Sequence, residues 1–527
     1  MTSENHPLFT SYNSNINSQE DIIDSRLQKR QQDFNNIEDF SQIKENTISS
    51  ELSLGENSRN LIFKQKRLKH TIRPEITQSL KNNLSIPLDW YEQCLKTDFN
   101  INNLPQIFSN FKTNSDIKQK FLCLVGIRKL LLLENFPLQY LINEGIINLM
   151  IQILDLNSNP EFQFESILCL NYISTKASEK DCYLIVKEGI KSIIKLLESE
   201  YDELRLETPL LVGNLVLDSS KIRNILIKEK IFDKLLIISG NTNNKNLIKN
   251  CTWAVSNFFR IKPLIAYDLA KKSIQIIAKN LLFLENDYDF LSDACFILCS
   301  ITENYKQGIK DLMEYNILSK IIQFLDCNVT YVQITCLRLV GNIASGNANQ
   351  TQKLIDLGLL EKLKKLIFNQ KKSLRKESAW ILSNIAAGTQ KQVETLISEN
   401  FLPIFEKSIK LDEREVKNEC IWAVCNLTNT KDNFYVNKIL EQNILEIIKM
   451  CLNMGEAKIV AVNLEALNNL LIFGKENEKN GINPVVEEIG RLGMFDILEN
   501  LQAHPVEVVY EKVIKLLEQF FDIQYNE

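Results

Sequence analysis

The sequence predicts an all-α fold built from stacked helical repeats, and three observations support this prediction. First, 527 residues exceed what one compact core normally holds, so the chain must form several domains or an array of repeats. Second, apolar residues at helical spacing outnumber alternating, strand-like patterns. Third, one residue type recurs at a nearly constant interval. Asparagines stand 43, 85, 42, 42 and 43 residues apart, with 85 equal to two strides, at Asn214, Asn257, Asn342, Asn384, Asn426 and Asn469.

A stride of about 42 residues is typical of armadillo or HEAT repeats. Each repeat in such an array has an apolar face that only its neighbour can cover, so the stack shares one elongated core. We therefore expect a right-handed armadillo-repeat superhelix, a solenoid of about ten repeats, over residues 86–525. To compare repeats, we take as the reference position the equivalent residue on the helix that carries, or would carry, the repeated asparagine. These positions are 126, 168, 210, 253, 296, 338, 380, 422 and 465. The segment 484–521 is expected to cap the array.

Residues 1–80 have a different composition from the rest of the chain. They are rich in Asn, Ser, Gln and charged residues, and they cannot bury enough apolar surface to offset the entropy lost on ordering. We expect this segment to be largely disordered. Whether it is a helix-forming partner segment or a solvated tail is left open by the charge pattern. It has two basic islands. The first contains Arg26, Lys29 and Arg30, and the second contains Lys64, Lys66, Arg67, Lys69 and Arg73.

The composition excludes several classes of protein. A net charge of −5 disfavours nucleic-acid binding, where a basic excess is expected, and instead suits a basic partner. Twelve cysteines occur without a CxxC pair and with only three histidines, which indicates buried thiols in a reducing compartment and no metal site. No signal-peptide core and no apolar stretch long enough for a bilayer are found, so we expect a soluble intracellular protein without membrane contact.

Enzymatic activity is not expected either. The sequence contains no GxxxxGK[ST], HExxH or GxSxG motif and no histidine within the repeated pattern that would act as a base. No cofactor is therefore predicted.

The repeated asparagines are accompanied by tryptophans and acids at fixed offsets. Trp253, Trp380 and Trp422 stand four residues before an asparagine, and Glu207, Glu377 and Glu419 stand seven before. These offsets place the three groups on one face of a helix. Because an unpaired buried carboxamide would cost about 1–3 kcal/mol, we expect the asparagines to be exposed in a groove.

Together these groups would recognise an extended, lysine-rich peptide. A carboxamide both donates and accepts, so it can hold the backbone of an extended peptide. Parallel indoles can enclose the stem of Lys or Arg, with a cation–π attraction of about 0.5–2 kcal/mol per contact. The acids would attract the charged head. The alternative interpretation, that the tryptophans are ordinary core residues, is open for each of them singly.

Two segments carry a resemblance to a known family. LRKESAWILSNIAAGT (374–389) and VKNECIWAVCN (416–426) resemble the seventh and eighth armadillo repeats of importin-α, the adaptor for nuclear localisation signals. Segments 250–260, 291–296, 337–346 and 487–504 are similar to other repeats of that family, in unbroken order. The resemblance implies an adaptor that binds Lys/Arg-rich signals of cargo proteins at two sites. It also implies that the adaptor binds importin-β, returns with an export receptor, and shuttles between cytoplasm and nucleus.

The family's binding residues carry over unevenly. The C-terminal site of the family matches at Arg338, Asn342, Glu377, Trp380, Asn384, Glu419, Trp422 and Asn426. The N-terminal site matches only at Asn214, Asp218, Trp253 and Asn257. Leu168 and Leu210 stand where the family has tryptophan, Tyr172 where it has asparagine, and Phe296 where it has another indole; Pro209 lies within one of the expected helices. We therefore hypothesise that the C-terminal site does more of the binding than is usual.

The resemblance also gives the N-terminal segment an expected role. In the family this segment binds importin-β and folds back onto the groove as an autoinhibitor, and Lys64, Lys66, Arg67 and Lys69 have the spacing of such a pseudo-signal. The alternative is an armadillo scaffold similar to β-catenin, outside nuclear transport. Such a groove would be expected to carry Lys and Arg, whereas this stripe carries Glu and Asn, with Arg338 the exception.

Overall fold

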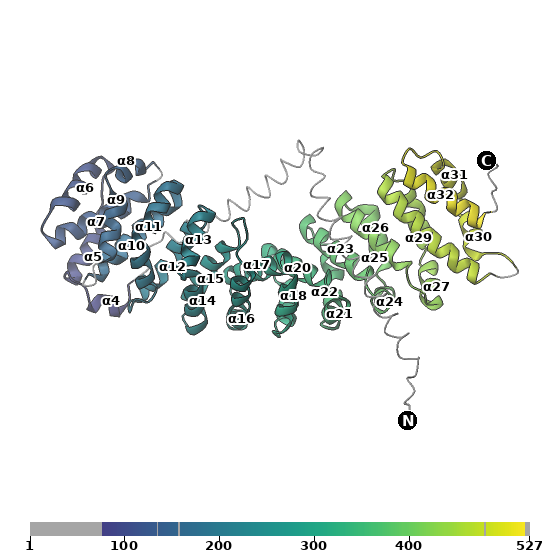
Figure 1. Ribbon diagram of the computed structural model, residues 1–527, viewed down its shortest axis with the longest axis horizontal. Coiled ribbons are helices and arrows are strands. Elements are labelled where there is room, and N and C mark those ends of the chain that lie inside the picture. Colours follow the sequence, from purple (N-terminus) through teal and green to yellow (C-terminus); the bar gives the residue numbers. More distant parts are fainter. Residues whose placement is uncertain (1–75, 134, 156–158, 479–480, 522–527) are drawn as a thin grey trace, which may run out of the picture. The chain divides into compact units, whose positions relative to one another are not determined.

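The computed structural model describes residues 76–133, 135–155, 159–478 and 481–521 (Figure 1). Within these residues there are 29 α-helices and two short 3₁₀ helices, and no β-strand. The predicted all-α class is confirmed. The described residues fall into two compact units, 76–315 and 316–521, hereafter the N-terminal unit and the C-terminal unit.

The N-terminal unit contains sixteen helical elements. They are α4 (Gln78–Asn82), α5 (Leu88–Lys96), η1 (Ile101–Asn103), α6 (Leu104–Thr113), α7 (Ile117–Leu131), α8 (Leu138–Asn143), α9 (Ile146–Leu154), α10 (Pro160–Lys176), α11 (Glu179–Leu196), α12 (Asp202–Val216), α13 (Ser220–Lys228), α14 (Ile231–Asn241), α15 (Lys245–Phe258), α16 (Tyr267–Phe283), α17 (Tyr288–Asn304) and α18 (Lys306–Met313).

The C-terminal unit contains fifteen. They are α19 (Leu318–Gln323), η2 (Phe324–Asp326), α20 (Thr330–Ala344), α21 (Ala348–Asp356), α22 (Leu359–Leu366), α23 (Lys372–Ala386), α24 (Gln390–Ser398), α25 (Leu402–Leu411), α26 (Arg414–Leu427), α27 (Asn433–Glu441), α28 (Ile444–Leu452), α29 (Ala457–Glu476), α30 (Pro484–Arg491), α31 (Phe495–Leu501) and α32 (Glu507–Phe520).

A typical repeat has two shorter helices followed by a longer third helix, as in α21, α22 and α23. The first helix often begins at a capping box, such as Asn347 with Gln350 or Thr389 with Gln392, which satisfies backbone N–H groups at the helix start. The chain then turns into the second helix through a left-handed residue. Gly358 has φ 84° there, and Asn443 has φ 62° in the repeat after next. Glycine and asparagine tolerate this conformation best.

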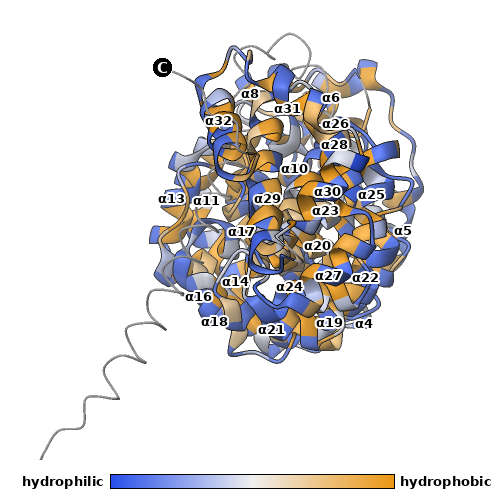
Figure 2. Cartoon of the chain, turned by 90° about the vertical axis from the view of Figure 1, so that its right-hand side faces the viewer, coloured by the Kyte–Doolittle hydropathy of each residue, from blue (hydrophilic) through white to orange (hydrophobic). Residues whose placement is uncertain are grey.

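The third helices form the interior of each unit. In the N-terminal unit α7, α10, α12, α15 and α17 pack in succession, and in the C-terminal unit α20, α23, α26, α29 and α32 do the same. Every predicted reference position from 126 to 465 falls within one of these helices. Figure 2 shows apolar segments along the helices of the array, while many connecting loops are hydrophilic.

The first described helix lies against the N-terminal unit. Glu203 at the start of α12 accepts a hydrogen bond from the backbone N–H of Thr77, the residue that caps α4. Glu161 at the start of α10 accepts from the backbone N–H of Ser85 at 3.2 Å and from its hydroxyl. Thr77 and Ser85 therefore contact the N-terminal unit, although both precede position 86, where we expected the array to start.

The cysteines are buried, as their positions predicted. All twelve are free thiols, and all except the half-buried Cys327 lie in the interior. Burial raises the pKa of Cys94 to about 11, so this thiol is neutral at physiological pH. Among the described residues, no group of three or more His, Cys, Asp or Glu side chains is placed to hold a metal ion.

One helix differs from our expectation about membrane-length segments. Among the described residues, α29 alone is long and apolar enough, by length and composition, to cross a bilayer. In this structure the helix packs within the protein, because α29 contacts α26, α28, α30 and α32. A third helix that is covered from several sides is expected to be apolar on most of its faces.

Candidate peptide-binding sites

The predicted C-terminal site lies on three successive helices of the C-terminal unit. Arg338, Trp380 and Trp422 occupy the same reference position on α20, α23 and α26. These helices are in direct contact, α20 with α23 and α23 with α26 (Figure 1). The predicted residues of this site are therefore brought onto one stack of helices.

The two acids of the C-terminal site each bond to the preceding repeat. Glu377 accepts from Nε of Arg338 at 2.9 Å, and this arginine side chain is 43% exposed. Glu419 accepts from the hydroxyl of Ser383 at 2.7 Å. Both carboxylates are buried. Each acid therefore joins two repeats, and Glu377 is already paired with the guanidinium of Arg338.

Two of the tryptophans rest on glycines of the preceding repeat. A Cβ atom added to Gly341 would fall 2.1 Å from Cζ3 of Trp380, and one added to Gly213 would fall 2.3 Å from Cζ3 of Trp253. Trp380 is 6% exposed and Trp253 is 4% exposed, whereas Trp422 is half-buried. Trp253 and Trp380 therefore serve as packing residues between repeats, which is the alternative that the sequence left open for single tryptophans.

The asparagines are less exposed than we expected. Asn214, Asn257, Asn342 and Asn384 are all buried, with exposed fractions from 1% to 8%, and Asn426 is half-buried. The prediction that these carboxamides are solvent-exposed is wrong for those four in this structure. The physical reason is that a carboxamide carries both a donor and an acceptor, so one end can serve the fold.

The donor end forms a ladder between repeats. Nδ2 of Asn214 donates to the backbone oxygen of Asn171 at 3.4 Å, and Nδ2 of Asn257 donates to that of Gly213 at 3.2 Å. Nδ2 of Asn426 lies 3.5 Å from the backbone oxygen of Ser383. In each case the acceptor belongs to the preceding repeat. It is the residue one place before that repeat's own asparagine position. Sequence reasoning missed this role, although the constant stride was its signal.

Two carboxamides keep an unused atom. Nδ2 of Asn384 and Oδ1 of Asn214 are buried and make no hydrogen bond in the described structure. A buried polar atom without a partner costs about 1–3 kcal/mol. A ligand backbone that reached these atoms would remove that cost.

The predicted N-terminal site lies on α12 and α15, which pack directly on each other. Asn214 is near the end of α12, Trp253 and Asn257 are on α15, and half-buried Asp218 follows two residues after α12 ends. Here Asn257 uses both ends of its carboxamide, because Oδ1 also accepts from Nε of Arg260 at 3.1 Å. At Asn257 no carboxamide end is left for a ligand, whereas Oδ1 of Asn214 in the same site has no partner.

Glu207, the predicted acid on α12, points into the interior of the N-terminal unit. Oε2 of Glu207 accepts from Nδ2 of Asn171 at 2.9 Å, and the carboxyl is buried. Burial raises the pKa of Glu207 to about 8, although the Asn171 hydrogen bond opposes the rise. We expected this acid to attract ligand cations, but at neutral pH it is mostly protonated and provides little charge.

The departures from the family pattern are also buried. Leu168, Leu210 and Tyr172 are at most 6% exposed. Nζ of Lys176 lies 4.8 Å from the centre of the Tyr172 ring. The aromatic walls expected from the family are thus replaced by aliphatic packing on α10 and α12.

Pro209, which the sequence analysis placed within an expected helix, does not end that helix. Helix α12 runs from Asp202 to Val216 with the proline inside it. A proline in a helix interior costs about 3 kcal/mol, partly because it leaves carbonyl groups without donors. Side chains supply donors nearby: Oγ1 of Thr208 bonds to the oxygen of Leu204, and Nδ2 of Asn250 bonds to that of Leu206 at 2.8 Å.

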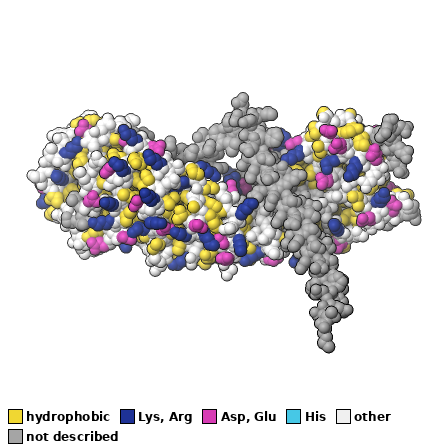
Figure 3. Space-filling view, viewed as in Figure 1, with side chains coloured by type: hydrophobic (Ala, Val, Ile, Leu, Met, Phe, Trp, Pro, Cys, Tyr) yellow, Lys and Arg dark blue, Asp and Glu magenta, His cyan; other side chains and the backbone are white. Residues whose placement is uncertain are grey.

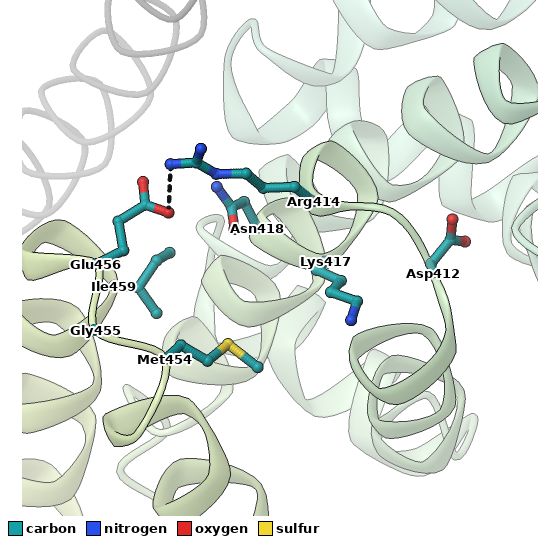
Figure 4. A pocket seen from close by; sticks show the side chains of 8 residues that line it. All are labelled: Asp412, Arg414, Lys417, Asn418, Met454, Gly455, Glu456 and Ile459. Carbon is teal, nitrogen blue, oxygen red and sulfur yellow. Dashed lines mark ion pairs between the residues drawn. The ribbon is translucent and has the colours of Figure 1, made fainter.

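One cavity of the C-terminal unit lies beside the predicted residues rather than among them. It has a volume of about 540 Å³ and opens between the starts of α26 and α29. Figure 4 shows Arg414 paired with Glu456 on one side at 2.9 Å, with Lys417, Asn418 and Met454 around the opening. None of the eight predicted residues of the C-terminal site lines it.

The described surface carries charges of both signs. Figure 3 shows Lys and Arg interspersed with Asp and Glu over the visible face. The basic islands of the N-terminal segment lie outside the described residues. They comprise Arg26, Lys29, Arg30, Lys64, Lys66, Arg67, Lys69 and Arg73.

Comparisons with known proteins place the chain in a family. Residues 347–387 match the armadillo/beta-catenin-like repeat family. The chain is 32% identical over 401 residues to importin subunit alpha-3 of Arabidopsis thaliana, covering 75% of each chain. It is 32% identical over 400 residues to importin subunit alpha-1b of Oryza sativa subsp. japonica, covering 75% of this chain and 74% of that one.

Solved structures support the fold independently. The crystal structure of an engineered protein, 18% identical, covers 80% of this chain and 98% of its own, with a TM-score of 0.65. At that identity the likeness concerns the fold alone. The identity and coverage of the two plant relatives, together with the armadillo match and the stacked third helices, show that this chain belongs to the importin-α family.

Proposed function

We propose that this chain is a nuclear import adaptor that binds Lys/Arg-rich localisation signals of cargo proteins and links them to importin-β. The observation that carries the proposal is the stack of α20, α23 and α26, which brings Arg338, Trp380 and Trp422 to equivalent positions on neighbouring helices. Membership of the importin-α family supports the same role.

The chemistry of the C-terminal site supports a basic, extended ligand. Glu377 and Glu419 place two carboxyl groups on the stack, and the half-buried Trp422 offers an aromatic surface to an aliphatic stem. Nδ2 of Asn384 is without a partner and can donate to a ligand carbonyl. An extended peptide with lysines satisfies all three kinds of group. We propose the eight residues assigned to this site as its contacts.

Binding of a fluorescent lysine-rich peptide to the purified full chain tests the proposal. We expect saturable binding that weakens as salt rises, because screening reduces attraction between exposed charges. A peptide with glutamine in place of lysine is the ligand control. Trp90→Ala is the protein control, since Trp90 lies on α5 outside both sites and bonds to the backbone of Lys118. Retention of neither peptide, or of both equally, would overturn the proposal.

The link to importin-β is proposed for residues 1–80, and recycling by an export receptor and shuttling between cytoplasm and nucleus follow from it. A pull-down with importin-β separates this adaptor from a general armadillo scaffold. The full chain is expected to retain importin-β, and a chain lacking residues 1–75 is expected to lose it. Equal retention by both chains would remove the N-terminal segment from the proposed function.

A further inference from the structure

An arginine that follows α15 reaches the fifth repeat, the one whose third helix is α17, at a place where a ligand cation would be expected to stack. Arg260 follows the end of α15, and its guanidinium carbon lies 3.9 Å from the centre of the Phe296 ring on α17. Its Nε donates to Oδ1 of Asn257 at 3.1 Å, and its Nη2 lies 3.4 Å from Oδ1 of Asp293. Helices α15 and α17 pack directly on each other.

The groups around Arg260 are the same three kinds that recur in the C-terminal site. Asp293 stands three residues before Phe296, as Glu377 stands before Trp380. Asn257 belongs to the asparagine ladder. An aromatic ring, a carboxylate and a carboxamide therefore surround this guanidinium, as they are proposed to surround a lysine or arginine of the ligand elsewhere.

The arginine is held firmly and remains charged. Its side chain is 14% exposed and that of Asp293 is 6% exposed. Burial lowers the pKa of Arg260 to about 10, while Asp293 opposes this decrease. At neutral pH the subsite thus already contains a cation, and a second cation from a ligand would meet repulsion as well as steric exclusion.

We infer that Arg260 acts as an internal substitute for a ligand cation and closes the fifth-repeat subsite. It is then a specificity-determining residue that limits the N-terminal site to peptides whose basic run ends at the subsite of Trp253. This inference rests on the proposed function, because it assumes that the array binds basic peptides. Removing the guanidinium should open room and negative charge for one further lysine or arginine.

The test uses the full chain carrying Trp380→Ala and Trp422→Ala, so that binding reports mainly on the N-terminal unit. Circular dichroism and thermal unfolding establish that each variant is folded. Arg260→Ala opens the subsite, and Arg260→Met removes the charge while filling most of the space. Arg260→Lys keeps a cation. Lys249→Met, on α15 and paired with Asp287 at 2.9 Å, is a control with the same change in net charge.

Each variant is titrated with a short lysine run and with the same run extended by one lysine at either end. Arg260→Ala is expected to strengthen binding of one extended peptide by about 2- to 30-fold relative to the short one, which corresponds to one cation–π contact. Arg260→Lys and Lys249→Met are expected to show no such gain. Arg260→Met should show a smaller one.

The outcomes separate the inference from the proposed function. If the unmodified chain binds the short peptide and Arg260→Ala gives no gain for either extension, the inference alone is overturned. An equal gain for both extensions, or the same gain with Lys249→Met, reports only on net charge and overturns it too. If neither the unmodified chain nor Arg260→Ala binds any lysine peptide, the proposed function fails together with the inference.

Discussion

The C-terminal unit and the N-terminal unit carry the same repeated pattern but use it differently. On α20, α23 and α26, Nδ2 of Asn384 is unpaired and Trp422 is half-buried. On α12 and α15, both ends of Asn257 are engaged within the chain, and Glu207 is buried against Asn171. A pattern of side chains therefore predicts a binding stripe only when neighbouring residues leave its polar atoms available.

The largest expected effect is on peptide affinity at the C-terminal site. Replacing both Trp380 and Trp422 by alanine removes the packing indole of Trp380 and the half-buried aromatic surface of Trp422. The surface of Trp422 alone offers about 0.5–2 kcal/mol to a cation, so binding should weaken by at least about 2- to 30-fold. Trp253→Ala should weaken binding by less than tenfold. Anisotropy titrations with one lysine-rich peptide measure the affinities of the unmodified chain, the double variant and Trp253→Ala. A larger loss for Trp253→Ala than for the pair would reverse the comparison between the units.

A second expected effect comes from removing the N-terminal segment. If residues 1–75 compete for the sites, a chain that lacks them should bind added peptide about tenfold more tightly, because the binding-competent fraction rises. Changing only Lys64, Lys66, Arg67 and Lys69 to alanine should give most of this gain. Unchanged affinity after deletion would exclude autoinhibition, because both sites would then be equally accessible to peptide in the full chain.

The glycines beneath the tryptophans offer a matched pair of changes. Gly341→Ala and Gly213→Ala each place a Cβ within about 2 Å of an indole, so each should destabilise the fold by about 1–3 kcal/mol through overpacking. Only Gly341→Ala should also weaken peptide binding strongly, because it displaces Trp380. Thermal unfolding and peptide titration are measured on both variants. Equal losses of affinity would contradict a dominant C-terminal site.

The smallest expected effect is on the pH dependence of stability. The pKa of Glu207 is about 8 in the folded chain against an ordinary 4.5, so between these values the folded state binds more protons than the unfolded state. The free energy of unfolding therefore falls as pH rises through that range. Glu207→Gln should remove this fall, and its unfolding midpoint should exceed that of the unmodified chain increasingly from pH 5 to pH 8. If the unfolding midpoints of the two chains changed in parallel between pH 5 and pH 8, Glu207 would not titrate in that range.

Much of the fold was predictable because it depends on short-range periodicity. The asparagine stride placed every third helix from 126 to 465 in the correct segment, and helical spacing identified the all-α class. The exposure of the asparagines and the effect of Pro209 were not predictable in the same way. Both depend on donors and acceptors contributed by another repeat about 40 residues away, such as Asn250 to the oxygen of Leu206.

Some of the missed contacts had a signal in the sequence. Gly213 and Gly341 precede Trp253 and Trp380 by 40 and 39 residues, nearly one stride, and in the fold each glycine lies against the indole of its tryptophan. Arg260 had no such signal, because its role depends on Phe296 replacing an indole and on the approach of α17. The contacts of Trp253, Trp380 and Arg260 therefore depend on pairs of residues from neighbouring repeats, which a single repeat does not reveal.

The carboxamide ladder has a consequence for how such a chain changes over evolutionary time. Each rung joins a repeat only to its immediate predecessor, as between Asn257 and Gly213. A mutation in one repeat is thus absorbed locally, and distant repeats keep their geometry. Under the proposed function, this modularity would let one repeat change, as at Phe296, without moving the side chains of the repeats that carry Trp380 and Trp422. The sequence can therefore diverge one repeat at a time while the remaining repeats keep their fold.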